Sequence, residues 1–406
     1  MATTLQHPTA STTTTDRGSF LLLAGLVGFV FAFRLCLTVL WFQDAPENAS
    51  LLSVALSLTL FFAAALSTIG STPSSPASSF RTPTLRSIAA FLGLVLLSLF
   101  WTLAPFTAAA GYWCAWAADV ATIWFLLRDG PPENSANAIM KGFVCGSCLV
   151  AIIAWSLPAT QDLRLGEEDF LHPNALGFLF SIATLLAGHL ARKSAVWIWP
   201  ALFLGATLLR TFSKSAIIAF VAAFGFALLR DSTLSRKVKL RIGIAAGLIL
   251  ASLWGLLEAY LATYTETAGP ETLTGRTLIW AISLEYAIKK PLLGNGFYSY
   301  RFVVPPIGKF EAQQAHDELL QQFFSFGAVG VILTIALYWI FFRQIRRAAP
   351  GHLKTLAASL LLFALIRGLT DTQNFDLSFP LWLMAMLSIL FAAQASFTQN
   401  HRRSPA

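Results

Sequence analysis

The chain has 406 residues, of which 56% are hydrophobic and only 12% are charged, and it carries a formal net charge of +8. A soluble protein of this composition would expose a large apolar surface, so the composition excludes that class and favours a helical membrane domain. The 34 Phe and 12 Trp residues suit contact with lipid and anchoring at its surface.

Apolar runs of the length of a membrane span recur along the chain. A helix needs about 20 apolar residues to cross the hydrocarbon core. We therefore predict an all-α, polytopic membrane protein of about twelve spans, at residues 20–41, 51–69, 87–105, 110–127, 139–157, 174–190, 195–210, 213–229, 242–263, 316–342, 355–370 and 378–396. Spans seven and eight are short and closely connected, so a re-entrant hairpin is the alternative there.

The segments between the spans predict the orientation. Residues 1–19 are rich in Thr and Ser and predict a disordered tail, and residues 397–406 form a second tail. With both tails cytoplasmic, the inner segments hold about twice as many Lys and Arg residues as the outer ones, as the positive-inside rule requires. This bias explains the basic net charge without a nucleic-acid partner.

One outer segment, residues 264–315, is too long for a simple connection between spans nine and ten. Residues 272–290 within it predict an amphipathic helix that lies in the plane of the lipid headgroups and ends before Pro291. The residues expected to share one apolar face are Leu278, Ala281 and Ile282.

Basic residues on the outer face are candidates for binding an anion. Arg210 and Lys214 lie at the outer ends of spans seven and eight with three hydroxyl residues between and beside them. Arg offers a planar fork for phosphate and Lys a point charge. Arg276 opens the amphipathic helix, where free backbone N–H groups also favour an anion. The alternative is that none of the three binds a ligand: Arg210 and Lys214 would then reach towards the lipid headgroups, and Arg276 would be a solvated surface residue.

Of the six histidines, only His172 and His316 lie on the predicted outer face. His316 falls in the first turn of span ten, where the helix dipole disfavours an imidazolium, whereas Asp317 and Glu318 favour it. A neutral imidazole at this boundary is a candidate general base, and the alternative is an ordinary surface histidine.

Metal sites are weakly indicated. The acidic run at residues 167–169, just before His172, is a candidate ligand set for a hard metal, but such runs are more often solvated loops. An Asp-x-Asp sequence does not occur in the chain. Cys145 and Cys148 form a C-x-x-C within an apolar run and are expected to be ordinary packing residues. We therefore predict no bound metal and no cofactor.

Charges at the ends of spans complete the set of candidates. Arg367, Asp371 and Asp376 flank the outer ends of spans eleven and twelve, where they are positioned to pair with one another or to reach the site. Arg34 falls near the outer end of the first span, and Asp119 falls at membrane depth. Polar residues at that depth are typical of transporters, so a transporter or lipid flippase is an alternative function.

Four segments in this order resemble the O-antigen ligase and polymerase family of membrane proteins. They are HPNALGF at 172–178, LLRTFSKSAIIAF at 208–220, GRTLIWAISLEYAIKKPLLGNGFYSY at 275–300 and HDELLQQFFSFGAVGVI at 316–332. The long outer segment before span ten fits as well. The family often has Arg at the position of Lys214 and Asn at that of Asp317.

The resemblance implies a GT-C-like glycosyltransferase in the inner membrane, with its active site facing the periplasm. The implied donor is an undecaprenyl-diphosphate-linked glycan, and the implied acceptor is lipid A-core. It implies an inverting transfer with a lipid diphosphate as the leaving group. A metal or fixed guanidinium groups must hold that leaving group, so we predict a metal-independent site in which Arg210 and Arg276 hold the diphosphate and Lys214 assists. His316 would act as general base or orient the acceptor. The implied supporting residues are Asp317, Arg34, Arg367, Arg301 and His172. A polymerase with the same donor and a protein O-oligosaccharyltransferase remain as alternatives.

Overall fold

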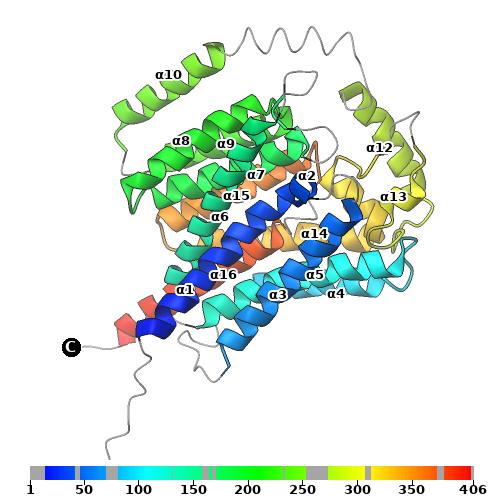
Figure 1. Ribbon diagram of the computed structural model, residues 1–406, viewed down its shortest axis with the longest axis horizontal. Helices are drawn as coiled ribbons and strands as arrows, with labels where there is room; N and C mark the ends of the chain where they lie inside the picture. The colour runs from blue at the N-terminus through cyan, green and yellow to red at the C-terminus, as the bar shows by residue number, and fades with distance from the viewer. Residues whose placement is uncertain are drawn as a thin grey trace, which may run out of the picture.

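Helices are the only regular elements in the described part of the chain, as the computed structural model shows (Figure 1). Seven of them are long and apolar enough to cross a membrane. The prediction of an all-α, polytopic membrane protein is therefore confirmed. The structure describes residues 14–41, 46–69, 81–129, 131–157, 164–166, 171–231, 234–252, 273–306, 312–372 and 379–403.

Every predicted span overlaps a helix. The helices up to residue 190 are α1 (Thr14–Phe33), η1 (Arg34–Cys36), α2 (Leu37–Trp41), α3 (Pro46–Ser67), α4 (Pro83–Ser98), α5 (Phe106–Arg128), α6 (Pro132–Ser156) and α7 (Pro173–Leu190). Those that follow are η3 (Ala195–Trp197), α8 (Ile198–Arg210), α9 (Lys214–Arg230), α10 (Arg236–Ser252), α12 (Leu273–Ala287), α13 (Tyr300–Val303), α14 (Glu318–Arg347), α15 (His352–Gly368) and α16 (Leu381–Arg403).

Several helices begin or end some residues away from the predicted spans. The helix α1 begins at Thr14 inside the predicted tail, and α16 continues past residue 396 to Arg403. The helix α14 begins at Glu318 rather than at residue 316. A helix that is already formed gains a hydrogen bond with each added residue, so the first two extend past the apolar run that nucleates them. The rest of both tails and residues 253–263 of the ninth span lie outside the described residues.

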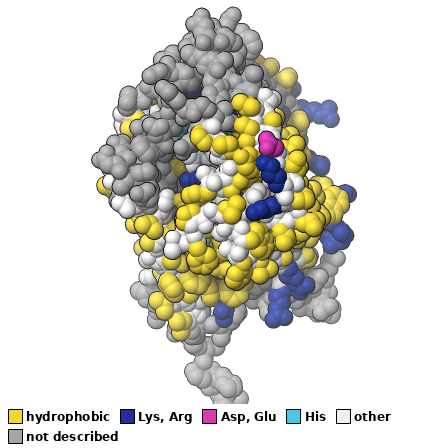
Figure 2. All heavy atoms as spheres, turned by 90° about the vertical axis from the view of Figure 1, so that its right-hand side faces the viewer, with side chains coloured by type: hydrophobic (Ala, Val, Ile, Leu, Met, Phe, Trp, Pro, Cys, Tyr) yellow, Lys and Arg dark blue, Asp and Glu magenta, His cyan; other side chains and the backbone are white. Residues whose placement is uncertain are grey.

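The helices form one bundle, and α12 and α13 form a cap at one end of it (Figure 1). In Figure 1, α12 and α13 lie at the right, α10 stands apart at the upper left, and the start of α1 and the end of α16 lie together at the lower left. Hydrophobic side chains cover much of the described surface in Figure 2. Such a surface suits a lipid environment, as the composition requires.

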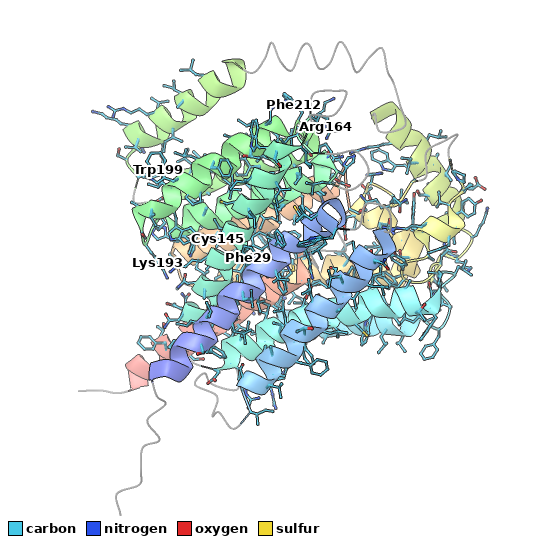
Figure 3. The ribbon with its side chains drawn as sticks, in the orientation of Figure 1. Phe29, Cys145, Arg164, Lys193, Trp199 and Phe212 are labelled. Atoms are coloured by element: carbon cyan, nitrogen blue, oxygen red, sulfur yellow. The ribbon has the colours of Figure 1, made fainter. Side chains whose placement is uncertain are left out.

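Glycines bring α1 and α6 into close contact. A Cβ added at Gly142 would lie 1.8 Å from the carbonyl oxygen of Gly25, and one at Gly28 would lie 1.9 Å from that of Ile139. Small residues that allow backbones to approach are a recurrent basis of helix packing in membranes. Of the C-x-x-C on this part of α6, Cys145 is a free, exposed thiol near Phe29 (Figure 3), and Cys148 packs against the hydrophobic core.

A buried ion pair accounts for Arg34 and Asp119. Arg34 Nη1 lies 2.9 Å from Asp119 Oδ2 and donates a hydrogen bond of 2.9 Å to Ser57 Oγ. These contacts tie the end of α1 to α5 and α3. Asp119 therefore has a structural partner, which weakens the argument for a transporter.

The segment after α12 inserts into a break in α14. Gly327 interrupts α14 with φ 63° and ψ −158°, and Gly294 also has positive φ. The N–H groups of Asn295 and Gly296 donate to the carbonyls of Phe324 and Ser325 at 2.9 and 2.8 Å. The N–H of Ala328 donates to the Pro291 carbonyl at 2.8 Å. Residues 291–296 thus replace the hydrogen bonds that α14 loses at its break, and they fix the cap to the bundle.

Replacing Gly327 with Ala should lower stability by about 2 kcal/mol or more, because this backbone region is nearly restricted to glycine. The added Cβ would also lie 2.3 Å from the carbonyl carbon of Leu292. Thermal unfolding in detergent measures the effect. Gly93→Ala in α4 is the control, since a Cβ there meets nothing within 4 Å. Equal stability of the two variants would contradict the role given to Gly327.

Candidate active site

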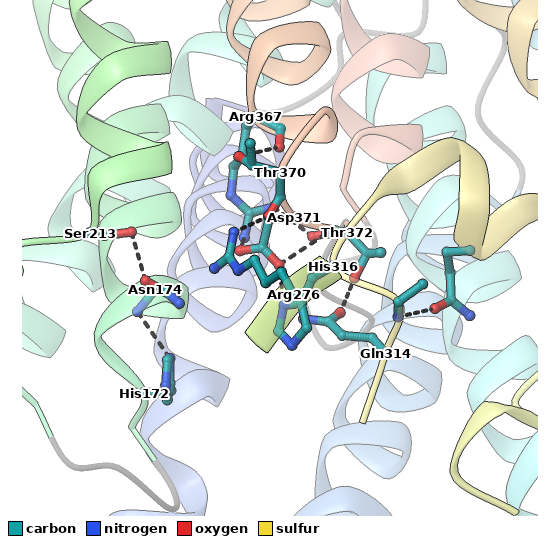
Figure 4. Close-up of polar contacts among 12 residues, drawn as sticks. His172, Asn174, Ser213, Arg276, Gln314, His316, Arg367, Thr370, Asp371 and Thr372 are labelled. Carbon is teal, nitrogen blue, oxygen red and sulfur yellow. Dashed lines mark hydrogen bonds and ion pairs between the residues drawn. The ribbon is translucent and has the colours of Figure 1, made fainter. Parts of the chain in front are cut away.

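A polar cluster forms where the segment before α14 meets the end of α15 (Figure 4). Asp371 is its centre. Arg367 Nη2 lies 2.8 Å from Asp371 Oδ2, and His316 Nδ1 lies 3.3 Å from Asp371 Oδ1. Gln314 Nε2 donates to the same Oδ1 at 3.2 Å, and the Thr372 N–H donates to it at 3.0 Å. One carboxylate therefore orients a guanidinium, an amide and an imidazole.

His316 lies before α14 rather than in its first turn, so that part of the prediction is wrong. Its backbone is in the left-handed region with φ 51°, which is strained for a residue other than glycine. Asp317 is the N-cap of α14 and accepts the Leu320 N–H at 2.8 Å. The Asp317 side chain thus accepts one of the free N–H groups at the start of α14. The chain turns sharply just before it, at His316, and the imidazole ring is directed to Asp371. The side chain of His316 stays 19% exposed, so it is accessible from solvent.

Arg276 reaches this cluster from α12. Its Nη1 donates a hydrogen bond to the carbonyl of Thr370, next to Asp371. The residue is half-buried and lies near the start of α12, as predicted. The helix α12 therefore supplies a guanidinium to a site that is otherwise built from the end of α15, the residues after it and the segment before α14.

A second set of contacts joins the start of α7 to the corner between α8 and α9. Asn174 Oδ1 accepts hydrogen bonds from Arg164 Nη2 at 2.8 Å and from Ser213 Oγ at 3.0 Å. Arg164 Nε also donates to the Thr211 carbonyl at 3.1 Å. His172 Nδ1 accepts the Asn174 N–H at 3.1 Å, so this histidine caps α7. Arg164 and Phe212 lie together in Figure 3.

This corner presents the two cations that the sequence singled out. Arg210 ends α8 with its guanidinium 5.6 Å from the centre of the Phe212 ring, and Lys214 begins α9 as an exposed side chain. Lys214 is within electrostatic range of Arg164 and Arg276. Arg210, Lys214 and Arg276 are thus on one side of the molecule, although they come from three different helices.

Arg367 connects the two sets of contacts. Its guanidinium lies 4.3 Å from the centre of the Phe178 ring on α7, and its Nη1 donates to the Thr372 carbonyl at 2.6 Å. Arg367 is 3% exposed and its charge is balanced by Asp371. Its buried guanidinium therefore joins α7 to the cluster around Asp371. Two supporting candidates lie elsewhere. Arg34 is used by Asp119, and Arg301 lies 5.1 Å from the Tyr298 ring on the exposed side of α13.

The charge of Asp371 is strongly stabilised. Burial alone would raise the pKa of this carboxyl, but Arg367 and the hydrogen bond from His316 lower the pKa below its usual range. Burial raises the pKa of Asp317, against the opposing effect of its backbone hydrogen bond from Leu320. Asp371 is therefore the fixed anion that can orient His316.

Asp371→Asn should reduce stability near neutral pH by about 3 kcal/mol, because Arg367 would stay buried without its carboxylate. A lowered pKa contributes stability that is complete above the unfolded value of about 4 and is lost as the pH falls towards the native value. The difference between wild type and variant should therefore shrink below about pH 4. Thermal unfolding at neutral pH and near pH 3 measures it, with Asp129→Asn as a control at the end of α5. An equal difference at both pH values would contradict the lowered pKa.

Within the described ranges, no three His, Cys, Asp or Glu side chains are grouped so that they could hold a metal ion. The acidic run at residues 167–169 and Asp376 lie outside the described residues.

Two comparisons with known proteins indicate the family of this chain. A family model described as O-antigen ligase matches residues 199–335. An O-antigen ligase of Pseudomonas aeruginosa PAO1 is 29% identical over 197 residues, which cover 47% of this chain and 46% of that protein. Both findings support the O-antigen ligase family. The chain spans about half the length of the curated relative that it matches.

The O-antigen ligase match contains Arg210, Lys214, Arg276 and His316, which are the four residues given a direct role from the sequence. Arg367 and Asp371 lie beyond it. The structure adds Gln314 and Arg164, to which the sequence analysis gave no role. In the sequence, Gln314 is one of several polar residues before span ten, and Arg164 is a single basic residue between two spans. Neither pattern predicts the contacts with Asp371 and Asn174.

Proposed function

We propose that this protein transfers a glycan from an undecaprenyl-diphosphate carrier to lipid A-core at the periplasmic face of the inner membrane. The observation that carries the proposal is the contact between His316 Nδ1 and Asp371 Oδ1, beside the guanidinium of Arg276. A histidine oriented by a carboxylate and a cation beside it are the two groups that a transfer with a diphosphate leaving group requires.

In this mechanism the Nδ1–H of His316 donates a hydrogen bond to the Asp371 carboxylate, which leaves Nε2 as a proton acceptor. The acceptor hydroxyl of lipid A-core gives its proton to Nε2 as its oxygen forms a bond to the anomeric carbon. The bond from that carbon to the diphosphate oxygen breaks on the opposite face, so the configuration inverts. The leaving diphosphate keeps the electron pair.

Arg276, Arg210 and Lys214 hold the diphosphate. A departing diphosphate gains negative charge in a site with little water, and fixed cations stabilise that charge most when they are already in position. Arg276 is held by the Thr370 carbonyl, and the guanidinium of Arg210 lies 5.6 Å from the centre of the Phe212 ring. With three cations from three helices in place, we propose that the transfer needs no metal ion.

The test is glycan transfer by the purified full chain in proteoliposomes. Lipid-diphosphate-linked glycan and lipid A-core are supplied in the presence of EDTA, and the products are separated on a gel. The expected product is lipid A-core that carries the glycan, at a rate that EDTA does not change. Longer lipid-linked glycan without transfer to the core would identify a polymerase instead, and loss of the product on adding EDTA would reject metal independence.

A further inference from the structure

A second polar pocket lies at the end of α7 opposite to the candidate active site. It has a volume of about 200 Å³ and opens between α6, α7, α15 and α16. Lys193 marks this end in Figure 3, well separated from Arg164 and Phe212 at the other. The polar residues that line the pocket are Glu133, Asn137, His189, Lys193, His352 and Gln394. The mechanism uses none of them.

The charges in this pocket are separated. Lys193 Nζ donates to Asn137 Oδ1 at 3.4 Å, a long contact, while Glu133 Oε1 accepts from Gln394 Nε2 at 3.2 Å. The ion pairs in the described part of the chain do not include one between Lys193 and Glu133. The neighbouring cation Arg192 pairs with Asp231. The pocket therefore offers one ammonium and one carboxylate to an occupant.

The rest of the lining suits a lipid. Two imidazoles, His189 and His352, can each donate an N–H even when neutral. The remaining wall is apolar and consists of Ala136, Met140, Leu353 and Leu390. Basic pockets between membrane helices recurrently bind lipid headgroups. Here a carboxylate is added to the cation, so the fixed charges of the lining cancel.

We propose that this pocket binds the headgroup of a phosphoethanolamine lipid. The phosphate accepts hydrogen bonds from Lys193 and the imidazoles, and the primary ammonium donates to Glu133. A choline headgroup has the same phosphate but no N–H for Glu133, and an anionic glycerol headgroup has no cation for it. The proposal does not depend on the transfer reaction.

Native mass spectrometry of the full chain tests this proposal, with phosphatidylethanolamine, phosphatidylcholine and phosphatidylglycerol supplied in equal amounts. We expect about tenfold stronger retention of phosphatidylethanolamine than of phosphatidylcholine, as one charge-assisted hydrogen bond provides. Lys193→Gln should weaken retention of phosphatidylethanolamine by about tenfold, and Glu133→Gln should abolish its preference over phosphatidylcholine. Lys237→Gln, at an exposed position of α10, should change neither value.

Three results would overturn the proposal. The first is stronger retention of phosphatidylglycerol than of phosphatidylethanolamine, and the second is unchanged retention in Lys193→Gln. The third is a thermal stabilisation by inorganic phosphate equal to that by the lipid, which would indicate a site for a free anion. Thermal unfolding of each variant without added lipid checks that it is folded.

Discussion

Replacing His316 with Asn should reduce the rate of glycan transfer by about 10²- to 10⁴-fold, the usual contribution of a general base. Asn is the decisive substitution because it tolerates the left-handed backbone that His316 adopts, whereas Ala would add strain at φ 51°. A loss in the Asn variant therefore reports the missing imidazole and not a displaced loop.

Turnover numbers in proteoliposomes measure this effect. The melting temperature of the Asn variant should match that of the wild type. A variant with near-normal turnover would remove His316 from the mechanism and would leave the Asp371 cluster with a structural role alone.

Replacing Arg276 with Ala should reduce the turnover number by about 10²-fold or more, since a preorganised cation acts on the charge that develops in the transition state. Arg276→Lys should recover only part of the rate, because an ammonium cannot reach both the Thr370 carbonyl and a phosphate oxygen as a fork does. Arg236→Ala, at an exposed position of α10, is the matched control.

The kinetic constants separate two roles for Arg276. A lower turnover number with an unchanged KM for the lipid-linked donor places the guanidinium on the leaving group in the transition state. A raised KM with normal turnover would mean that Arg276 only binds the donor, and the assignment to the leaving diphosphate would then be wrong. Unchanged constants would exclude Arg276 from the site.

Much of the fold follows from the sequence because membrane helices are long apolar runs. Even the short spans at residues 195–210 and 213–229 coincide with helices, and the helix predicted at 272–290 is α12. The three residues expected to share its apolar face do not have the same environment. Leu278 is 47% exposed, while Ile282 packs against the protein beside Ile279 and Ala287. Periodicity alone does not tell which face of such a helix meets lipid and which meets protein.

The candidate site was only partly predictable. The possible pairing of Arg367 with Asp371 was visible because the two residues are one helical turn apart. The contact between His316 and Asp371 joins residues that are 55 positions apart, and it depends on the positive φ of His316. A backbone conformation of this kind depends on the surrounding structure and has no signature in the sequence.

The break in α14 also bears on how the protein is assembled in the membrane. Phe324 and Ser325 have carbonyls that residues 291–296 satisfy, and an unsatisfied carbonyl costs several kcal/mol in hydrocarbon. Residues 291–296 precede α14 in the chain, so they leave the ribosome first. The turns of α14 on either side of its break can settle only when this segment lies beside them. Placement of residues 291–296 and folding of α14 are therefore coupled steps in assembly.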